Sequence, residues 1–262
     1  MAVQEISASQ LLKVTDLAFA YRKIRVIEGI DFHLNRGEIC SVIGPNGAGK
    51  TTFLNLLSGK LVPNRGEIVY RNRSITRLSP EARRHLGLAR SFQITNIFLH
   101  KTVYENVRFA VQGLHKKRYA MWRPIDDYRD IEKETEELIH LMNLQALKNA
   151  RCLDLAYAEQ RLVELALTLA GGAEVLLLDE PTAGLSLEES RYVAALIRRL
   201  VDERGVSIVF IEHDMDIVFS ISDRIAVMYY GKLLVTDTPE RVRQNEQVQK
   251  IYLGEMGGES VQ

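Results

Sequence analysis

One nine-residue stretch constrains this 262-residue chain more than any other. It fits the pattern GxxxxGK[ST] and reads Gly44-Pro45-Asn46-Gly47-Ala48-Gly49-Lys50-Thr51-Thr52. An apolar run, Glu38–Ile43, precedes it, and a helical pattern over Thr51–Leu57 follows it. Glycines let successive backbone N–H groups turn toward an anion without a Cβ clash, and the helix start adds partial positive charge. The stretch therefore predicts a loop that binds the phosphates of a nucleotide.

Two side chains at the end of this loop suit that chemistry. Lys50 is expected to reach the β- and γ-phosphates, and the Thr51 hydroxyl is expected to bind Mg²⁺. The alternative is a chance glycine-rich turn, which average residue usage produces in about one random chain of this length in a hundred. The strand before the loop and the helix after it favour phosphate binding.

Composition excludes several other classes of protein. Lys+Arg and Asp+Glu are both 34, and this zero net charge argues against nucleic-acid binding by bulk attraction. No uncharged apolar run approaches the ~18 residues of a membrane helix, and the first residues lack the apolar core of a secretion signal. Cys40 and Cys152 form no CxxC pair, which argues against disulfide scaffolds and cysteine zinc sites and favours a reducing cytosol.

Short apolar runs alternate with helical patterns, which predicts an α/β fold. The expected strands are Leu11–Leu17, Glu38–Ile43, Glu67–Tyr70, Val175–Asp179, Ser207–Ile211 and Arg224–Met228. The runs Val175–Leu178 and Ile208–Ile211 are apolar throughout, which is typical of parallel strands buried on both faces.

Helix starts are expected at Ser79, Ser186 and Thr238, each of which stands before a proline or acidic residues. From about Thr102 to Leu169 the pattern is helical, with a polar stretch at Lys116–Arg129. We therefore expect a mostly helical lobe inserted into an α/β lobe.

Two apolar strands end in polar residues at the edge where open α/β sheets bind ligands. After Val175–Leu178, Asp179 suits the Mg²⁺ shell, and Glu180 suits the activation of a water molecule beyond the γ-phosphate. Two solvated acids are the alternative, which the neighbouring phosphate loop disfavours. After Ile208–Ile211, His213 can donate a hydrogen bond to the γ-phosphate. A core histidine or a metal ligand remains the alternative for His213, although no second histidine lies at ligand spacing.

These motifs and their order resemble the nucleotide-binding subunit of an ATP-binding cassette (ABC) transporter, over about Leu11 to Leu253. The resemblance implies that Tyr21 stacks on adenine, and that Gln93 of Arg90-Ser91-Phe92-Gln93 contacts Mg²⁺ and the γ-phosphate and signals to a membrane partner. From the residues alone, Tyr21 is a strand-end aromatic and Gln93 a surface amide. The family's LSGGQ signature corresponds to Leu155, Ala156, Tyr157, Ala158 and Glu159.

The resemblance also implies the architecture. It predicts an α/β P-loop NTPase core with a mostly parallel sheet, an antiparallel β subdomain and an inserted helical subdomain. One domain, residues 1–262, would comprise a core lobe (1–94 and 170–262) and a helical lobe (95–169).

The resemblance further implies ATP and Mg²⁺ as ligands, and slow hydrolysis by a lone chain, because the signature acts across a subunit interface. The expected partners are a second ATPase subunit in a homo- or heterodimer, two membrane permeases and, indirectly, a periplasmic binding protein; nucleic acid is not expected. The place of action would be the cytoplasmic face of the inner membrane, as a peripheral protein.

Finer features resemble the larger ATPase subunit of branched-chain amino-acid importers. They are the Leu-Ala-Tyr opening of the signature, Glu212–Met215, Ile221–Arg224, Asp237–Glu240, Tyr252–Glu255 and the extra stretch around Lys116–Tyr128. Urea-importer and lipopolysaccharide-export ATPases share much of this. A soluble ABC ATPase of translation or DNA repair is disfavoured because neither a second cassette nor a coiled-coil insertion is present, and a regulatory pseudo-ATPase is disfavoured because Lys50 and Glu180 are intact.

Among the departures from the family pattern, Ala156 replaces the signature serine, Ala158 its second glycine, and Ser186 the usual Asp. Ser186 also fits a helix cap, with Glu189 completing a capping box. All three lie in elements offered to the nucleotide of the partner. They motivate the hypothesis that, in a heterodimer, the composite site using this chain's Lys50 and Glu180 is competent and the other is weaker.

Overall fold

The computed structural model describes residues 9–91, 97–114 and 129–251. Their centre is a six-stranded sheet in the order β10-β9-β3-β8-β7-β6. Its members are β3 (Ile39–Ile43), β6 (Leu88–Arg90), β7 (Val175–Asp179), β8 (Ser207–Ile211), β9 (Arg224–Tyr229) and β10 (Lys232–Asp237). Every neighbouring pair is parallel except β9 and β10. This confirms the mostly parallel sheet expected from the sequence.

Three of the four inner strands, β3, β8 and β7, are buried along their whole length. Alternate side chains enter different apolar clusters, because the side chains of a strand alternate between its faces. In β7, for example, Leu176 and Leu178 join one cluster while Val175 and Leu177 join the other. Apolar residues at successive positions are therefore required here, which explains the runs that predicted these strands.

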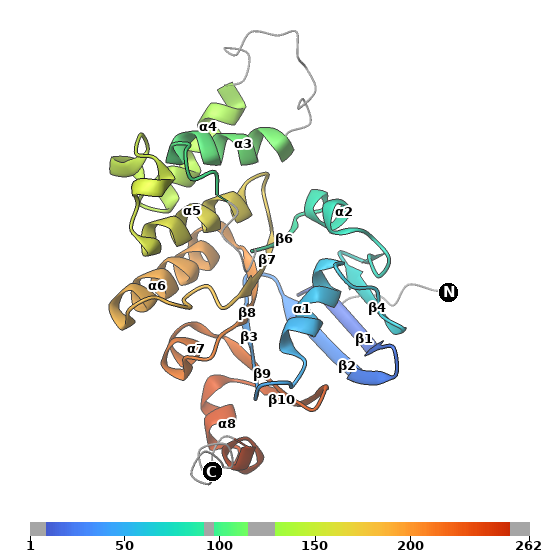
Figure 1. The fold of residues 1–262 in the computed structure, drawn as a ribbon. Coiled ribbons are helices and arrows are strands. Elements are labelled where there is room, and N and C mark those ends of the chain that lie inside the picture. Colours follow the sequence, from blue (N-terminus) through green and yellow to red (C-terminus); the bar gives the residue numbers. More distant parts are fainter. Residues whose placement is uncertain (1–8, 92–96, 115–128, 252–262) are drawn as a thin grey trace.

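A second sheet of four strands, in the order β2-β1-β4-β5, is antiparallel throughout. Its strands are β1 (Gln10–Tyr21), β2 (Ile24–Asn35), β4 (Arg65–Tyr70) and β5 (Arg73–Ser74). It shares an apolar cluster with α1 (Lys50–Ser58), in which the rings of Phe32 and Phe53 meet edge to face at 5.4 Å. Figure 1 shows α1 and this sheet on one side of the six-stranded sheet.

Helices cover the opposite face (Figure 1). They are α5 (Tyr157–Leu169), α6 (Leu187–Arg204) and α7 (Met215–Ile221), with α3 (Val103–Leu114) and α4 (Arg129–Leu141) packed beyond α5. The remaining helices are α2 (Pro80–His85) and α8 (Pro239–Gln244), and η2 (Gln145–Leu147) and η3 (Cys152–Asp154) are 3₁₀ turns. None of these helices, in the ranges given above, is long and apolar enough to cross a membrane.

Between Thr102 and Leu169 the described residues form helices, 3₁₀ turns and one isolated bridge from Thr102 to Arg151, as the helical pattern predicted. Residues 115–128, which contain most of the polar stretch, lie outside the described part. Strands β2, β5, β6 and β10 were not predicted. Glycine and charged residues interrupt the apolar pattern of β2, and β5 and β6 have only two and three residues.

The three predicted helix starts are confirmed, although their caps differ. Ser79 accepts a hydrogen bond from the Ala82 N–H, and Ser186 accepts one from the Glu189 N–H while Glu189 bonds back to the Ser186 N–H. Thr238 occupies the cap position of α8 without a side-chain cap bond.

This difference predicts unequal effects of two matched substitutions at exposed cap positions. Ser186→Ala removes a capping bond and should cost about 1 kcal/mol of unfolding free energy, a drop in Tm of roughly 2–4 °C. Thr238→Ala removes no capping bond and should shift Tm by less. Thermal unfolding followed by circular dichroism measures both, and equal shifts would contradict the capping role of Ser186.

Candidate functional site

The glycine-rich loop lies where the sequence placed it, between β3 and α1. Gly44 has φ +148°, and a Cβ there would stand 2.1 Å from the carbonyl oxygen of Met228 in β9. Gly49, with φ +100°, precedes α1 without any side-chain cap, and a Cβ there would stand 3.0 Å from the Val26 carbonyl oxygen. Both positions therefore require glycine, and the first amides of α1 have no side-chain acceptor at the cap position.

Lys50 folds back across this loop. Its side chain is buried, and its Nζ donates to the carbonyl oxygens of Gly44 (2.6 Å) and Pro45 (3.0 Å). The next residue, Thr51, is exposed at the start of α1. The buried Lys50 ammonium and the exposed Thr51 hydroxyl lie together where the glycine-rich loop ends and α1 begins. This arrangement suits the binding of an anion accompanied by a hard cation such as Mg²⁺.

Asp179 ends β7 with its side chain fully buried. Arg90, at the end of β6, donates to its Oδ2 (3.0 Å), whereas its Oδ1 has no hydrogen-bond partner among the described residues. Burial raises the pKa of Asp179, and the Arg90 charge opposes this rise. A buried carboxylate oxygen without a donor is the kind of ligand that Mg²⁺ takes, so the residues present fit this ion.

Arg90 also binds α1. Its Nη1 donates to Asn55 Oδ1 and to Ser58 Oγ (3.2 Å), so one guanidinium connects β6, α1 and β7. Desolvation by burial lowers the pKa of Arg90, and Asp179 opposes that shift. No role was predicted for Arg90, because an arginine at the end of a short strand carries no local signal of this contact.

Glu180 and His213 meet at the adjoining strand ends. Parallel pairing sets Asp179 opposite Ile211, and the next residues bring Glu180 Oε1 within 2.9 Å of His213 Nε2. Glu180 has φ +51°, which is uncommon for a residue with a side chain, and its N–H donates to the Ile211 carbonyl oxygen (2.9 Å). Both side chains remain partly exposed, at 40% and 48%, which leaves them accessible to a substrate.

Tyr21 is the last residue of β1, which pairs with β2, the strand that lies against the glycine-rich loop. It is 47% exposed, pairs with Ile24 of β2 and packs edge to face on Phe19 at 4.8 Å. Val26, two residues further along β2, is the residue whose carbonyl oxygen abuts Gly49. Strand β2 thus connects Tyr21 to the loop. Gln93 lies outside the described residues.

The signature segment begins α5. Ala156 is the cap residue, and its N–H donates to Glu159 Oε2 (2.8 Å). The Tyr157 ring, 44% exposed, has the Arg161 guanidinium 5.0 Å from its centre and lies 3.3 Å from the position of a Cβ on Gly184. The segment therefore packs against the turn that follows Glu180. Leu155 is buried, whereas Ala158 is half-buried.

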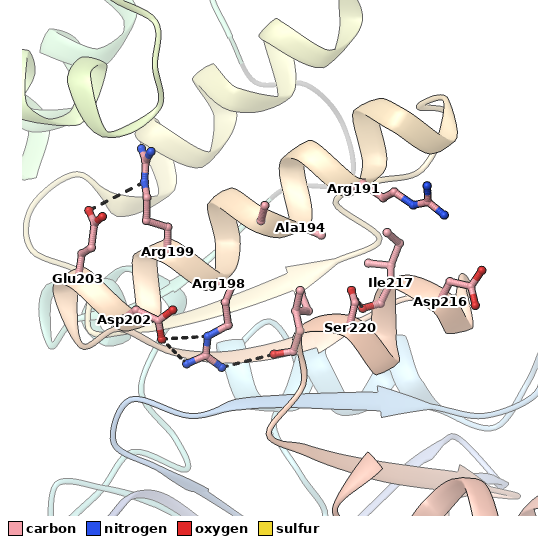
Figure 2. A pocket seen from close by; sticks show the side chains of 11 residues that line it. Arg191, Ala194, Arg198, Arg199, Asp202, Glu203, Asp216, Ile217 and Ser220 are labelled. Atoms are coloured by element: carbon pink, nitrogen blue, oxygen red, sulfur yellow. Dashed lines mark hydrogen bonds and ion pairs between the residues drawn. The ribbon is translucent and has the colours of Figure 1, made fainter. Parts of the chain in front are cut away.

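A charged groove of about 680 Å³ lies elsewhere, between α6 and α7 (Figure 2). None of the predicted site residues lines it. Arg198 is paired with Asp202 (2.7 Å) and Asp223 (3.0 Å). The candidate site is therefore the sheet edge formed by the loop, Asp179, Glu180 and His213, and not this groove.

Comparison with known proteins shows the family of the chain. Residues 27–183 match the family model described as "ABC transporter". The chain is 35% identical over 250 residues to the high-affinity branched-chain amino acid transport ATP-binding proteins LivG of Salmonella typhimurium and BraF of Pseudomonas aeruginosa. Each alignment covers 94% of this chain and 98% of the relative.

A solved structure has the same fold. It is a dimeric ATP-binding cassette in a post-hydrolysis state with ADP and phosphate, and it superimposes with a TM-score of 0.73 at 22% identity. The match covers 87% of this chain and 99% of that one. The predicted fold class and family are thereby confirmed. The chain belongs to the ABC transporter family, as one of its ATP-binding subunits.

Proposed function

We propose that this chain is the ATP-hydrolysing subunit of an importer for branched-chain or other hydrophobic amino acids, acting at the cytoplasmic face of the plasma membrane. The observation that carries the catalytic part is the convergence of the Lys50 loop, Asp179 and the Glu180–His213 pair at one sheet edge. The substrate class is supported by similarity to LivG and BraF along nearly the whole of each chain.

In this proposal the loop residues Gly44 to Thr52 hold the triphosphate of ATP, with Lys50 at the β- and γ-phosphates. Thr51 and Asp179 hold Mg²⁺, with Gln93 as a further ligand. Bound Mg²⁺ supplies positive charge that offsets the charge on the phosphate oxygens. Tyr21 stacks on the adenine ring, which its exposed position at the end of β1 permits.

Glu180 takes a proton from the water molecule that attacks the γ-phosphorus, while ADP leaves. His213 Nε2 lies 2.9 Å from the Glu180 carboxylate. In this proposal its N–H turns from that carboxylate to the γ-phosphate when ATP binds. The close contact of the two side chains supports a joint role, because a base must be held within hydrogen-bond reach of its water.

The proposed partners are those expected of an ATP-binding subunit of this family. A second ATPase subunit closes over the bound nucleotide, and the Leu155–Glu159 segment of this chain serves the nucleotide of that subunit. Two permeases bind the helical part. There, Phe98 (61% exposed) and Phe109 (42%) form an exposed ring pair at 6.0 Å, which is an apolar surface suited to a protein partner. A periplasmic binding protein acts through the permeases, and nucleic acid is not a partner.

Reconstitution with candidate permeases tests the transport role. Vesicles containing the two permeases, both ATPase subunits and a binding protein loaded with leucine should hydrolyse ATP several-fold faster than vesicles with empty binding protein. Urea-loaded binding protein and lipopolysaccharide serve as the alternative stimulants. Stimulation by either of these, without a response to leucine, would replace amino-acid import by urea import or lipid export.

Lys50→Ala should abolish ATP binding, because it removes an ammonium and its hydrogen bonds from a buried anion site. Fluorescent ATP-analogue titration measures the affinity. Lys60→Ala, at an exposed position just after α1, is the matched control and should bind normally. Wild-type affinity in Lys50→Ala would remove this side chain from the phosphate site.

Glu180→Gln should retain ATP binding but hydrolyse at least ~10²-fold more slowly, because an amide accepts no proton from water. Phosphate release by the assembled transporter measures turnover, with the exposed Glu240→Gln as control. Near-normal turnover would exclude Glu180 as the base.

In a heterodimer, the equivalent change in the partner subunit tests asymmetry between the two sites. An equally complete loss of turnover would contradict a weaker second site.

A further inference from the structure

Glu212 is a buried acidic residue that has no role in the catalytic steps proposed above. It follows β8 directly, and only 5% of the residue is exposed. Its Oε1 accepts hydrogen bonds from the Thr182 N–H (3.1 Å) and from the Thr182 hydroxyl, and its Oε2 accepts one from the His213 N–H (2.9 Å). One carboxylate thus binds the turn after β7 to the turn after β8.

These two turns carry the two side chains that meet at the site. Glu180 begins the first turn with a left-handed backbone, and the Ala183 N–H closes that turn on the Glu180 carbonyl oxygen (3.1 Å). A residue with a Cβ is strained in this left-handed conformation, which persists where surrounding contacts fix it. The bonds from Thr182 to Glu212 are such contacts, because Thr182 lies inside the turn.

The same turn continues to the signature segment of this chain. Gly184 lies against the Tyr157 ring, and a Cβ on Gly184 would stand only 3.3 Å from it. A shift of Thr182 would therefore move the proposed base, Glu180, on one side and the support of Tyr157 on the other.

We propose that Glu212 is a positioning residue for ATP hydrolysis: its carboxylate holds the Glu180 turn in fixed register with the backbone of His213. The proposal rests on the hydrolytic role proposed above. Glu212 touches neither nucleotide nor water in this scheme. It acts on turnover through Glu180 and His213, and it leaves the phosphate loop unchanged.

Three variants and one control test this assignment. Glu212→Gln keeps the shape but presents an amide N–H₂ that cannot accept from a backbone N–H, so it loses at least one of the bonds. Thr182→Val removes only the hydroxyl, and Thr182→Ser restores it. Thr135→Val, in α4, is the matched control, because it also deletes a fully buried threonine hydroxyl that is hydrogen-bonded, here to the Ile131 carbonyl oxygen (2.7 Å).

The measurements are kcat and KM for ATP in the assembled transporter, the affinity of each variant for a non-hydrolysable Mg-nucleotide, and Tm. Glu212→Gln and Thr182→Val should lower kcat by about tenfold or more, with KM and analogue affinity within about threefold of wild type. Thr182→Ser should recover most of the turnover, and Thr135→Val should retain it.

Equal turnover in Glu212→Gln and wild type would overturn the proposal. So would a parallel loss of analogue affinity and kcat, because that marks general damage and not misplacement of the catalytic pair. If Glu212→Gln fails to fold, Thr182→Val against Thr182→Ser decides alone. Failure of the proposed hydrolytic role is distinguishable, because the wild-type assembly would then show no ATP hydrolysis at all.

Discussion

The site depends on one buried ion pair. Arg90 reaches from β6 to Asp179 at the end of β7 and also binds two side chains of α1, so a single guanidinium joins the helix behind the phosphate loop to the strand that carries the acids. Burial disfavours both charges, and each pKa shift is opposed by the partner. Losing one member of such a pair typically costs about 3–5 kcal/mol. The pair also determines which oxygen of Asp179 is available to a ligand. Arg90 donates to Oδ2, whereas Oδ1 has no protein donor among the described residues.

The rest of the geometry follows from parallel register. Leu178 of β7 lies opposite Phe210 of β8, and Phe210 lies opposite Ser41 of β3, so the three strands end at the same edge. The residue that follows each strand end then stands beside the next. This is how Glu180 meets His213 although they are 33 positions apart. The phosphate loop and the residues after β7 and β8 are far apart in the sequence, and the parallel register of the three strands brings them to one edge of the sheet.

Elements were predicted from the sequence where a local pattern of residues has a single physical explanation. Uninterrupted apolar runs predicted β7 and β8, and the GxxxxGK[ST] pattern between a strand and a helix predicted the glycine loop. The structure adds a second reason for glycine at Gly44, which is the close approach to the Met228 carbonyl oxygen. Strand β2 escaped prediction because Arg25, Glu28 and Gly29 break its apolar pattern, and pairing with β1 forms it nonetheless. The bridging contacts of Arg90 and Glu212 escaped for a related reason. Each joins segments far apart in the chain, and the partner of a buried charge is set by tertiary packing, which leaves no local pattern.

The N-termini of α1 and α5, which both have proposed roles in binding phosphates, differ in their capping residues. This difference concerns the proposed asymmetry between the two nucleotide sites of a dimer. Gly49 precedes α1 without a side-chain cap, and the first turn contains no acid, so its positive end is unopposed. At α5, Glu159 accepts the Ala156 N–H and adds a carboxylate to the first turn. An acid there stabilises the helix but repels an approaching phosphate. In the proposed dimer, this chain's contribution to the partner's nucleotide would therefore be weakened by charge as well as by the alanines at positions 156 and 158, whereas no acid stands in the first turn behind its own phosphate loop.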